Sequence, residues 1–149
     1  MEKDDCVFCK LVSNRIDYYG NIKNYKYWRV IISREQHTLS TLIILLKRHL
    51  IRFSSIDESE LLELNKIQKE MENVLDNLFK PNLYNYLQCG NATNHLHIHL
   101  IPRYKEERIF AKKRFTDQAY GDSVKETTDI ENPIIIKLLK KNITRQLSI

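Results

Sequence analysis

The chain has 149 residues, of which 42% are hydrophobic and 29% charged, and its formal net charge is +5. This length predicts a single domain, residues 1–149, with its own core. The longest apolar run, 41–46, is too short to cross a bilayer, and the charged N-terminal segment lacks the apolar stretch of a secretion signal, so a cytoplasmic location is expected. The mild positive charge slightly favours an anionic ligand, but lysines and glutamates are mixed along the chain, so no nucleic-acid-binding surface is indicated.

The first third of the chain predicts a short helix followed by two strands. Residues 6–20 begin with a Cys-x-x-Cys turn and continue as a helix-like segment. Aromatic and β-branched residues predict a strand at 25–33, and a second, more buried strand is expected at 40–49.

The next segments predict one long helix and a second pair of strands. Acidic residues in the first turn and a regular apolar stripe predict a helix within 54–79. Strands are expected at 83–90 and 95–104, joined by a short connection into an antiparallel pair, with Cys89 buried in the first of them. A final helix is expected at 132–147. This order predicts an α+β domain, an antiparallel sheet with a long helix packed on it.

Three of the five histidines alternate with apolar residues in the segment NHLHIHLIPRY, residues 94–104. Alternation is the period of a β-strand, so His95, His97 and His99 are expected to share one face. The apolar residues between them would point to the opposite, buried face. At about 3.3 Å per residue, neighbouring imidazoles would emerge about 7 Å apart.

Three interpretations of this histidine row are open. A purely structural role is disfavoured, because burying three polar rings without partners costs several kcal/mol. In the second, two or three imidazoles hold an open-coordinated catalytic zinc ion. In the third, a neutral imidazole attacks phosphorus while its other nitrogen donates to a backbone carbonyl, and a neighbouring histidine carries a proton or binds phosphate.

The segment CVFC contains a Cys-x-x-Cys pair, Cys6 and Cys9. Such a pair is typical of a redox site or of half a zinc site, and it also occurs by chance. No βαβ pattern surrounds it, which disfavours the redox interpretation. A tetrahedral zinc ion needs two further ligands, and His49 and His95 lie at strand ends that can meet the N-terminal turn. This closed site would leave the other two triad histidines free for chemistry.

The chain resembles the histidine triad family of nucleotide hydrolases and transferases over most of residues 6–104. The resemblance rests on three separated segments: CVFCK at the start, LIILLKRH ahead of the long helix, and HLHIHLIPR. The segments NYLQCGNATNHLHIHLIPRY and RFTDQAYG resemble a bacterial-type branch related to diadenosine polyphosphate hydrolases. The resemblance implies the histidine triad fold for this core and leaves residues 105–149 as a C-terminal extension.

The resemblance also implies catalytic and substrate-binding residues. The middle histidine of the triad, His97, is expected to attack the α-phosphorus of an adenine nucleotide and to form a nucleotidyl-histidine that water resolves. The third histidine, His99, is expected to bind phosphate and to assist the leaving group. Asn85 and Asn91, on the preceding strand and turn, are the expected contacts to ribose and phosphate.

In zinc-containing members of this family, the residues that match Cys6, Cys9, His49 and His95 hold a structural zinc ion. The resemblance therefore implies zinc as the cofactor and no organic cofactor. Relatives commonly form dimers, so a homodimer is also implied, with the long helix as a candidate part of its interface.

The sequence departs from the family pattern ahead of the second strand. Many members have a histidine eight residues before the histidine that follows Lys-Arg, and Thr41 stands at that position here. We include Thr41 among the substrate-binding candidates. His37 lies twelve residues back and is expected to be too distant unless the strand is longer or bulged. The usual proline is replaced by Leu46. The threonine at position 41 favours one alternative function, a nucleotide-binding regulatory module with little turnover.

Overall fold

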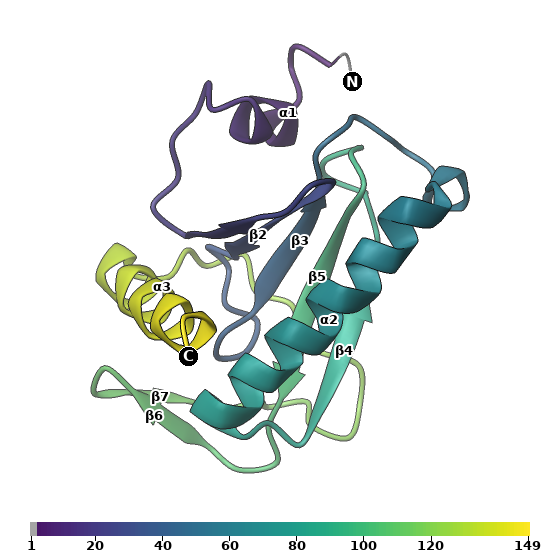
Figure 1. Ribbon diagram of the computed structural model, residues 1–149. Coiled ribbons are helices and arrows are strands. Elements are labelled where there is room, and N and C mark those ends of the chain that lie inside the picture. Colours follow the sequence, from purple (N-terminus) through teal and green to yellow (C-terminus); the bar gives the residue numbers. More distant parts are fainter. Residues whose placement is uncertain (1–2) are drawn as a thin grey trace.

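The computed structural model describes residues 3–149 (Figure 1). Its centre is a five-stranded antiparallel sheet with the strand order β1-β2-β3-β5-β4. The strands, in chain order, are β1 (Asn21–Asn24), β2 (Trp28–Ile32), β3 (Leu42–Leu46), β4 (Leu83–Leu87) and β5 (His97–Arg103). A separate hairpin is formed by β6 (Arg108–Phe110) and β7 (Lys113–Phe115).

Helices lie on both sides of this sheet. The elements are α1 (Val7–Val12), the 3-10 turn η1 (Phe53–Ser55), α2 (Glu58–Phe79) and α3 (Pro133–Leu147). Figure 1 shows α2 crossing one face of the sheet, while α3 contacts α2 and the β1–β2 edge. Within residues 3–149, no helix combines the length and the apolar character that crossing a membrane requires.

Side-chain alternation along the central strands separates two apolar layers. Val30, Ile44 and Ile98 face α2 and belong to the main core. Ile31 and Ile43 face the opposite way and pack with α1 in a smaller cluster. Strands β2 and β3 are buried at every position because both faces of the sheet are covered there. The polar face of β5 therefore opens on the α1 side of the sheet.

The structure confirms the α+β fold, with its antiparallel sheet and the long helix packed on it. The weakly patterned strand β1 and the β6–β7 hairpin were not predicted from the sequence. The prediction of a buried Cys89 is wrong: this side chain is exposed. Strand β4 ends at Leu87, and Gly90, with φ of +72°, turns the chain just beyond it, so Cys89 lies in a loop.

Glu60 fixes the start of α2 through two kinds of hydrogen bond. Its carboxylate accepts the backbone N–H of Asp57 at 2.9 Å and pairs with the Arg48 guanidinium at 2.6 Å. The hydrogen bond with Arg48 is the main reason that the pKa of Glu60 lies below its ordinary value of 4.5. We expect Glu60→Gln to lower the free energy of unfolding by about 1–2 kcal/mol at neutral pH, because Arg48 is partly exposed and water screens the pair.

This difference is expected to depend on pH in one direction. A carboxyl group with a lowered folded-state pKa contributes stability above its unfolded-state pKa and loses it as the pH falls through the folded-state value. Urea unfolding should therefore show wild type and Glu60→Gln converging below pH 4.5. Glu58→Gln, an exposed change in the same turn, is the matched control. An equal loss in both variants would contradict the assigned role of Glu60.

Candidate active site

The ring of His97 is held with one nitrogen occupied and the other free. Its Nδ1 lies 2.6 Å from the backbone oxygen of His95. A carbonyl oxygen can only accept, so Nδ1 carries the proton and Nε2 keeps its lone pair. The residue is 7% exposed, and this burial lowers the pKa of His97. The ring is therefore neutral near pH 7, with Nε2 available as a nucleophile or base.

His99 stands beside His97 on the same face of β5. The two ring centroids are 5.3 Å apart, closer than the about 7 Å that a strand places between alternate residues. Burial, with smaller contributions from His97 and His37, lowers the pKa of His99 to about 4. Both rings are thus uncharged at neutral pH, and His99 can offer an N–H group to an anion without carrying a charge.

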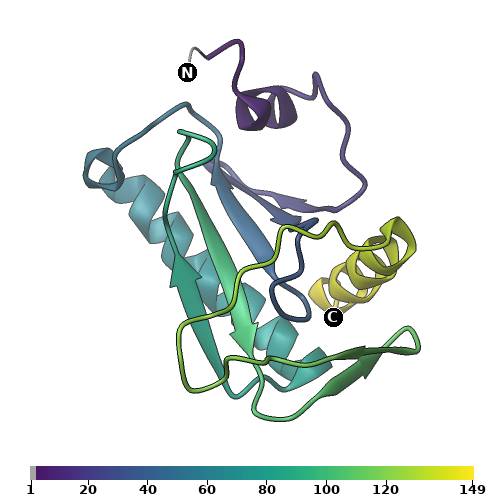
Figure 2. The same cartoon turned by 180° about the vertical axis from the view of Figure 1, so that it is seen from behind.

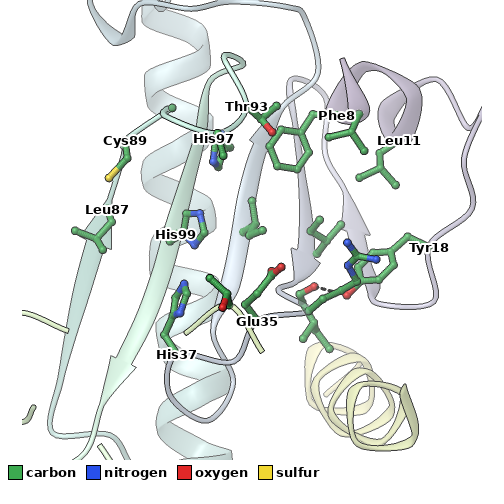
Figure 3. Close-up of a pocket in the computed structure, with 18 of the residues that line it drawn as sticks. Phe8, Leu11, Tyr18, Glu35, His37, Leu87, Cys89, Thr93, His97 and His99 are labelled. Carbon is green, nitrogen blue, oxygen red and sulfur yellow. Dashed lines mark hydrogen bonds between the residues drawn. The ribbon is translucent and has the colours of Figure 1, made fainter. Parts of the chain in front are cut away.

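Both histidines line a cavity of about 700 Å³ on the α1 side of the sheet (Figure 3). One end of this cavity is apolar, because α1 contributes Phe8 and Leu11 and strand β2 contributes Ile31. The Phe8 ring contacts His97, with centroids 4.7 Å apart. The cavity therefore places an apolar, partly aromatic wall next to a row of imidazoles.

A third histidine, His37, joins this row although it was expected to be too distant. Figure 3 shows His97, His99 and His37 one after another along the cavity wall. The rings of His37 and His99 are nearly parallel, with centroids 5.7 Å apart. Residues 33–41 form a compact loop, because the Gln36 side chain bonds the backbone of Ser33, Ser40 and Thr41. Counting along an extended strand overestimated the distance that this loop spans.

The substrate-binding candidates lie in different places. Asn91 lines the cavity. Asn85 instead accepts a hydrogen bond from the buried Arg103 at 2.7 Å and is not among the lining residues. Thr41 is fully buried, and its hydroxyl donates to the backbone oxygen of Thr38 at 2.9 Å. Both side chains are hydrogen-bonded within the protein, and of the three candidates only Asn91 lines the cavity. Contacts of these residues with a substrate stay predictions.

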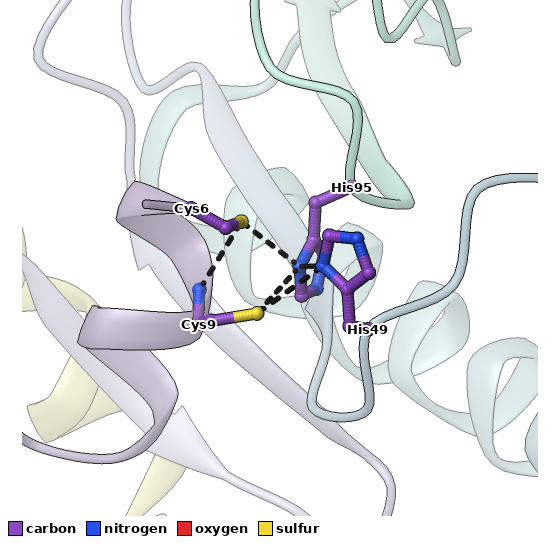
Figure 4. A group of neighbouring side chains, drawn as sticks. All are labelled: Cys6, Cys9, His49 and His95. Carbon is purple, nitrogen blue, oxygen red and sulfur yellow. Dashed lines mark hydrogen bonds between the residues drawn. The ribbon is translucent and has the colours of Figure 1, made fainter. Parts of the chain in front are cut away.

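Cys6, Cys9, His49 and His95 form a compact cluster next to this cavity (Figure 4). Their ligand atoms all lie within 4.8 Å of one another, and the Nδ1 atoms of the two histidines are 3.2 Å apart. The distance from Cys9 Sγ is 3.2 Å to His49 Nδ1 and 3.4 Å to His95 Nδ1. Ligands around a tetrahedral zinc ion lie about 3.3–3.8 Å apart, so the cluster fits that geometry.

The second nitrogen of His95 supports the same assignment. Its Nε2 lies 2.7 Å from the backbone oxygen of Leu46, so this nitrogen carries the proton and Nδ1 faces the cysteines. Metal-ligating histidines commonly donate their other N–H to a carbonyl in this way. Burial and the neighbouring Cys6 raise the pKa of the Cys9 thiol to about 11, so a thiolate here needs a cation beside it. Two thiols and two imidazoles form a closed structural donor set for zinc.

The comparison with protein families agrees with this arrangement. The model of the HIT domain matches residues 31–106, about half of the chain, and the protein therefore belongs to the HIT domain family. An uncharacterized HIT-like protein of Mycoplasma genitalium is 27% identical over 128 residues, which cover 74% of this chain and 83% of the relative. A further uncharacterized HIT-like protein, from Mycoplasma pneumoniae, is 25% identical over 70% of this chain and 76% of its own length.

Solved structures share the fold at lower identity. A hypothetical histidine triad nucleotide-binding protein from Sulfolobus tokodaii has a TM-score of 0.73 at 20% identity, over 96% of this chain and 92% of its own. A Zn-bound histidine triad family protein from Mycobacterium smegmatis has a TM-score of 0.69 at 15% identity, with 99% and 96% covered. The diadenosine triphosphate hydrolase of Plasmodium falciparum has a TM-score of 0.67 at 16% identity, with 89% and 79% covered.

Proposed function

We propose that this protein cleaves adenine nucleotides at the α-phosphate, as a hydrolase or nucleotidyl transferase, through a covalent intermediate on His97. One observation carries the proposal: the hydrogen bond from His97 Nδ1 to the oxygen of His95 leaves Nε2 unprotonated in the cavity. An imidazole in this state attacks phosphorus without first losing a proton. Membership of the HIT domain family and the fold shared with a diadenosine triphosphate hydrolase support the same chemistry.

The proposed reaction has two displacement steps at phosphorus. In the first, His97 Nε2 forms a bond to the α-phosphorus while the bond to the leaving group breaks, and the leaving group departs with the electron pair and takes a proton from water. In the second, water forms the new P–O bond, the N–P bond breaks, and one proton is released. The products are a nucleoside monophosphate and a neutral His97. Each step has an imidazole as nucleophile or leaving group, which divides the barrier of direct hydrolysis.

The residues around His97 suit the two ends of a nucleotide. The apolar wall formed by Phe8, Leu11 and Ile31 fits a nucleobase, because aromatic and aliphatic side chains bury its flat faces. Asn91, His99 and the nearby backbone offer N–H groups for phosphate oxygens. Preorganised donors of this kind stabilise the charge on a phosphoryl group in transfer.

The structure gives less support to the two alternative functions. A metal-dependent hydrolase would use the triad as ligands, yet within residues 3–149 only His95 of the triad belongs to a metal-ligating group. A binding module with little turnover was favoured by Thr41 in place of a histidine, but His37 now occupies a place in the cavity. We therefore keep the binding module only as an outcome of the test below.

The test is to incubate the purified protein with a panel of adenylated compounds, both dinucleoside polyphosphates and phosphoramidates, and to measure AMP. We expect AMP release from at least one compound. Tight AMP binding without turnover of any compound would instead identify a nucleotide-binding module.

Zinc bound by the cysteine and histidine cluster is proposed to stabilise the fold. When bound, it would hold α1 against the loops that carry His49 and His95 and would supply no chemistry at phosphorus. A homodimer and a cytoplasmic location stay predictions from the resemblance and the composition.

A further inference from the structure

The C-terminal extension forms part of the cavity wall. Residues 124–131, which we call the strap, lie outside the matched HIT segment and run toward α3. Figure 2 shows the strap passing over the face of the sheet opposite α2, across β5 and β3. Three strap residues, Glu126, Thr127 and Thr128, line the same cavity as His97 and His99.

The strap is fixed to the domain on both sides of these residues. Just before it, the backbone oxygen of Asp122 accepts a hydrogen bond from the buried Arg103 at 2.9 Å. At its end, the Glu131 N–H donates to the backbone oxygen of Arg34 at 2.8 Å, and the Glu131 carboxylate pairs with Lys113 at 2.6 Å. The backbone of Thr127 is therefore held at a defined place beside the histidine row.

The backbone N–H of Thr127 donates to Nδ1 of His37 at 3.0 Å. An amide N–H can only donate, so Nδ1 of His37 carries no proton and the neutral ring has its proton on Nε2. Burial lowers the pKa of His37, although Glu126 and Glu35 act in the opposite direction, so the ring is neutral near pH 7. This is the reverse of His97, whose Nδ1 carries the proton.

We propose that the strap holds His37 in the Nε2–H form, so that His37 donates from Nε2 to a phosphate oxygen of the nucleotide bound beside His99. The inference rests on the proposed function for the identity of the ligand. In this arrangement the backbone sets opposite tautomers of two histidines in one cavity. The carbonyl of His95 leaves a lone pair on His97 Nε2, and the amide of Thr127 leaves a proton on His37 Nε2. The positioning residue is Thr127, which acts through its backbone, and the sequence outside the HIT core thereby completes the site.

The first test reads the tautomer directly and needs no turnover. Long-range proton–nitrogen NMR correlations on the ¹⁵N-histidine-labelled full chain report which ring nitrogen carries the proton, and the His37 signals are assigned by their loss in His37→Gln. At neutral pH we expect an unprotonated Nδ1 and a protonated Nε2. A protonated Nδ1 on His37 would overturn the inference even in a protein that proves to be an active hydrolase.

The second test removes one N–H group from the strap. Thr127→Pro deletes the amide that binds His37, whereas Ile130→Pro makes the same change at an exposed residue whose amide donates to no group within residues 3–149. We expect Thr127→Pro to lower kcat about tenfold, because His37 then loses its hydrogen bond to the charged phosphate. Ile130→Pro is expected to lower kcat less than twofold. His37→Ala should match or exceed the effect of Thr127→Pro, and His37→Gln, which keeps a side-chain N–H, should recover part of it.

The results distinguish an effect of the strap on catalysis from a general loss of stability and from a failure of the proposed function. Equal kcat values for Thr127→Pro and Ile130→Pro, with any difference confined to the melting temperature, would overturn the role of the strap. If no compound is turned over, the proposed function fails, and AMP affinity becomes the readout. We then expect about tenfold weaker AMP binding in Thr127→Pro and His37→Ala, and unchanged AMP binding in both would overturn the inference.

Discussion

His97→Ala is expected to lower kcat by at least about 10³-fold, because the substitution removes the atom that forms the bond to phosphorus. Loss of a nucleophile from a covalent mechanism commonly costs more than loss of a residue that only transfers a proton. The fold should survive, since His97 lies on the α1 side of the sheet and takes no part in the main core. The variant should therefore unfold at a temperature close to that of wild type and still bind AMP.

His99→Ala is the informative companion variant. It stands on the same face of β5 and lines the same cavity, but in the proposed mechanism it binds phosphate and forms no bond to phosphorus. After rapid mixing with substrate and acid quench, mass spectrometry should detect a nucleotidyl adduct in wild type and in His99→Ala, and none in His97→Ala. Turnover by His97→Ala within about tenfold of wild type, or an adduct on another residue, would rule out covalent catalysis by His97.

The sequence was sufficient to predict the features that depend on short-range periodicity. His97 and His99 alternate with Ile98 and Leu100, so their common face follows from the geometry of any strand, whatever its partners. The cysteine and histidine cluster was predictable for a different reason. A tetrahedral zinc ion needs four ligands, and Cys6 and Cys9 supply two of them, so few residues remained to complete the set.

Features that depend on the shape of a loop or on the choice of hydrogen-bond partner could not be predicted from the sequence. Thr41 has the right spacing from His49, but the loop before β3 buries its hydroxyl against Thr38 and brings His37 into the cavity instead. Asn85 lies on the expected strand, but its amide oxygen is taken by Arg103. A satisfied buried hydrogen bond of this kind becomes visible only when strand register is known.

The strap was the largest omission. Residues 124–131 have neither helical nor strand periodicity, and their position over the sheet depends on contacts with residues far away in the chain, such as His37 and Arg34. A segment without periodicity leaves no signal in the sequence from which such contacts can be derived.

The second large effect is expected at the cysteine and histidine cluster, where Cys6→Ser should lower zinc content and thermal stability together. Cys6 is also the N-cap of α1, and its Sγ accepts the N–H of Cys9 at 3.5 Å. Serine is a good N-cap residue, so the substitution preserves that interaction and weakens only the metal site. Since metal binding adds directly to the free energy of folding, we expect the melting temperature to fall by on the order of 10 °C.

The loss of zinc should also affect the active site, because α1 connects the cysteine and histidine cluster to the cavity. Cys6 and Cys9 flank the segment that carries Phe8, which lines the cavity and contacts His97. We therefore expect Cys6→Ser to raise KM for the nucleotide more than it lowers kcat. Cys89→Ser is the matched control for zinc content and melting temperature, since Cys89 lines the cavity but lies outside the cluster. Metal analysis of protein purified without chelators should give about one zinc ion per chain in wild type and Cys89→Ser. If wild-type protein contains no zinc, or Cys6→Ser melts at the same temperature as Cys89→Ser, the cluster does not stabilise the fold through a metal.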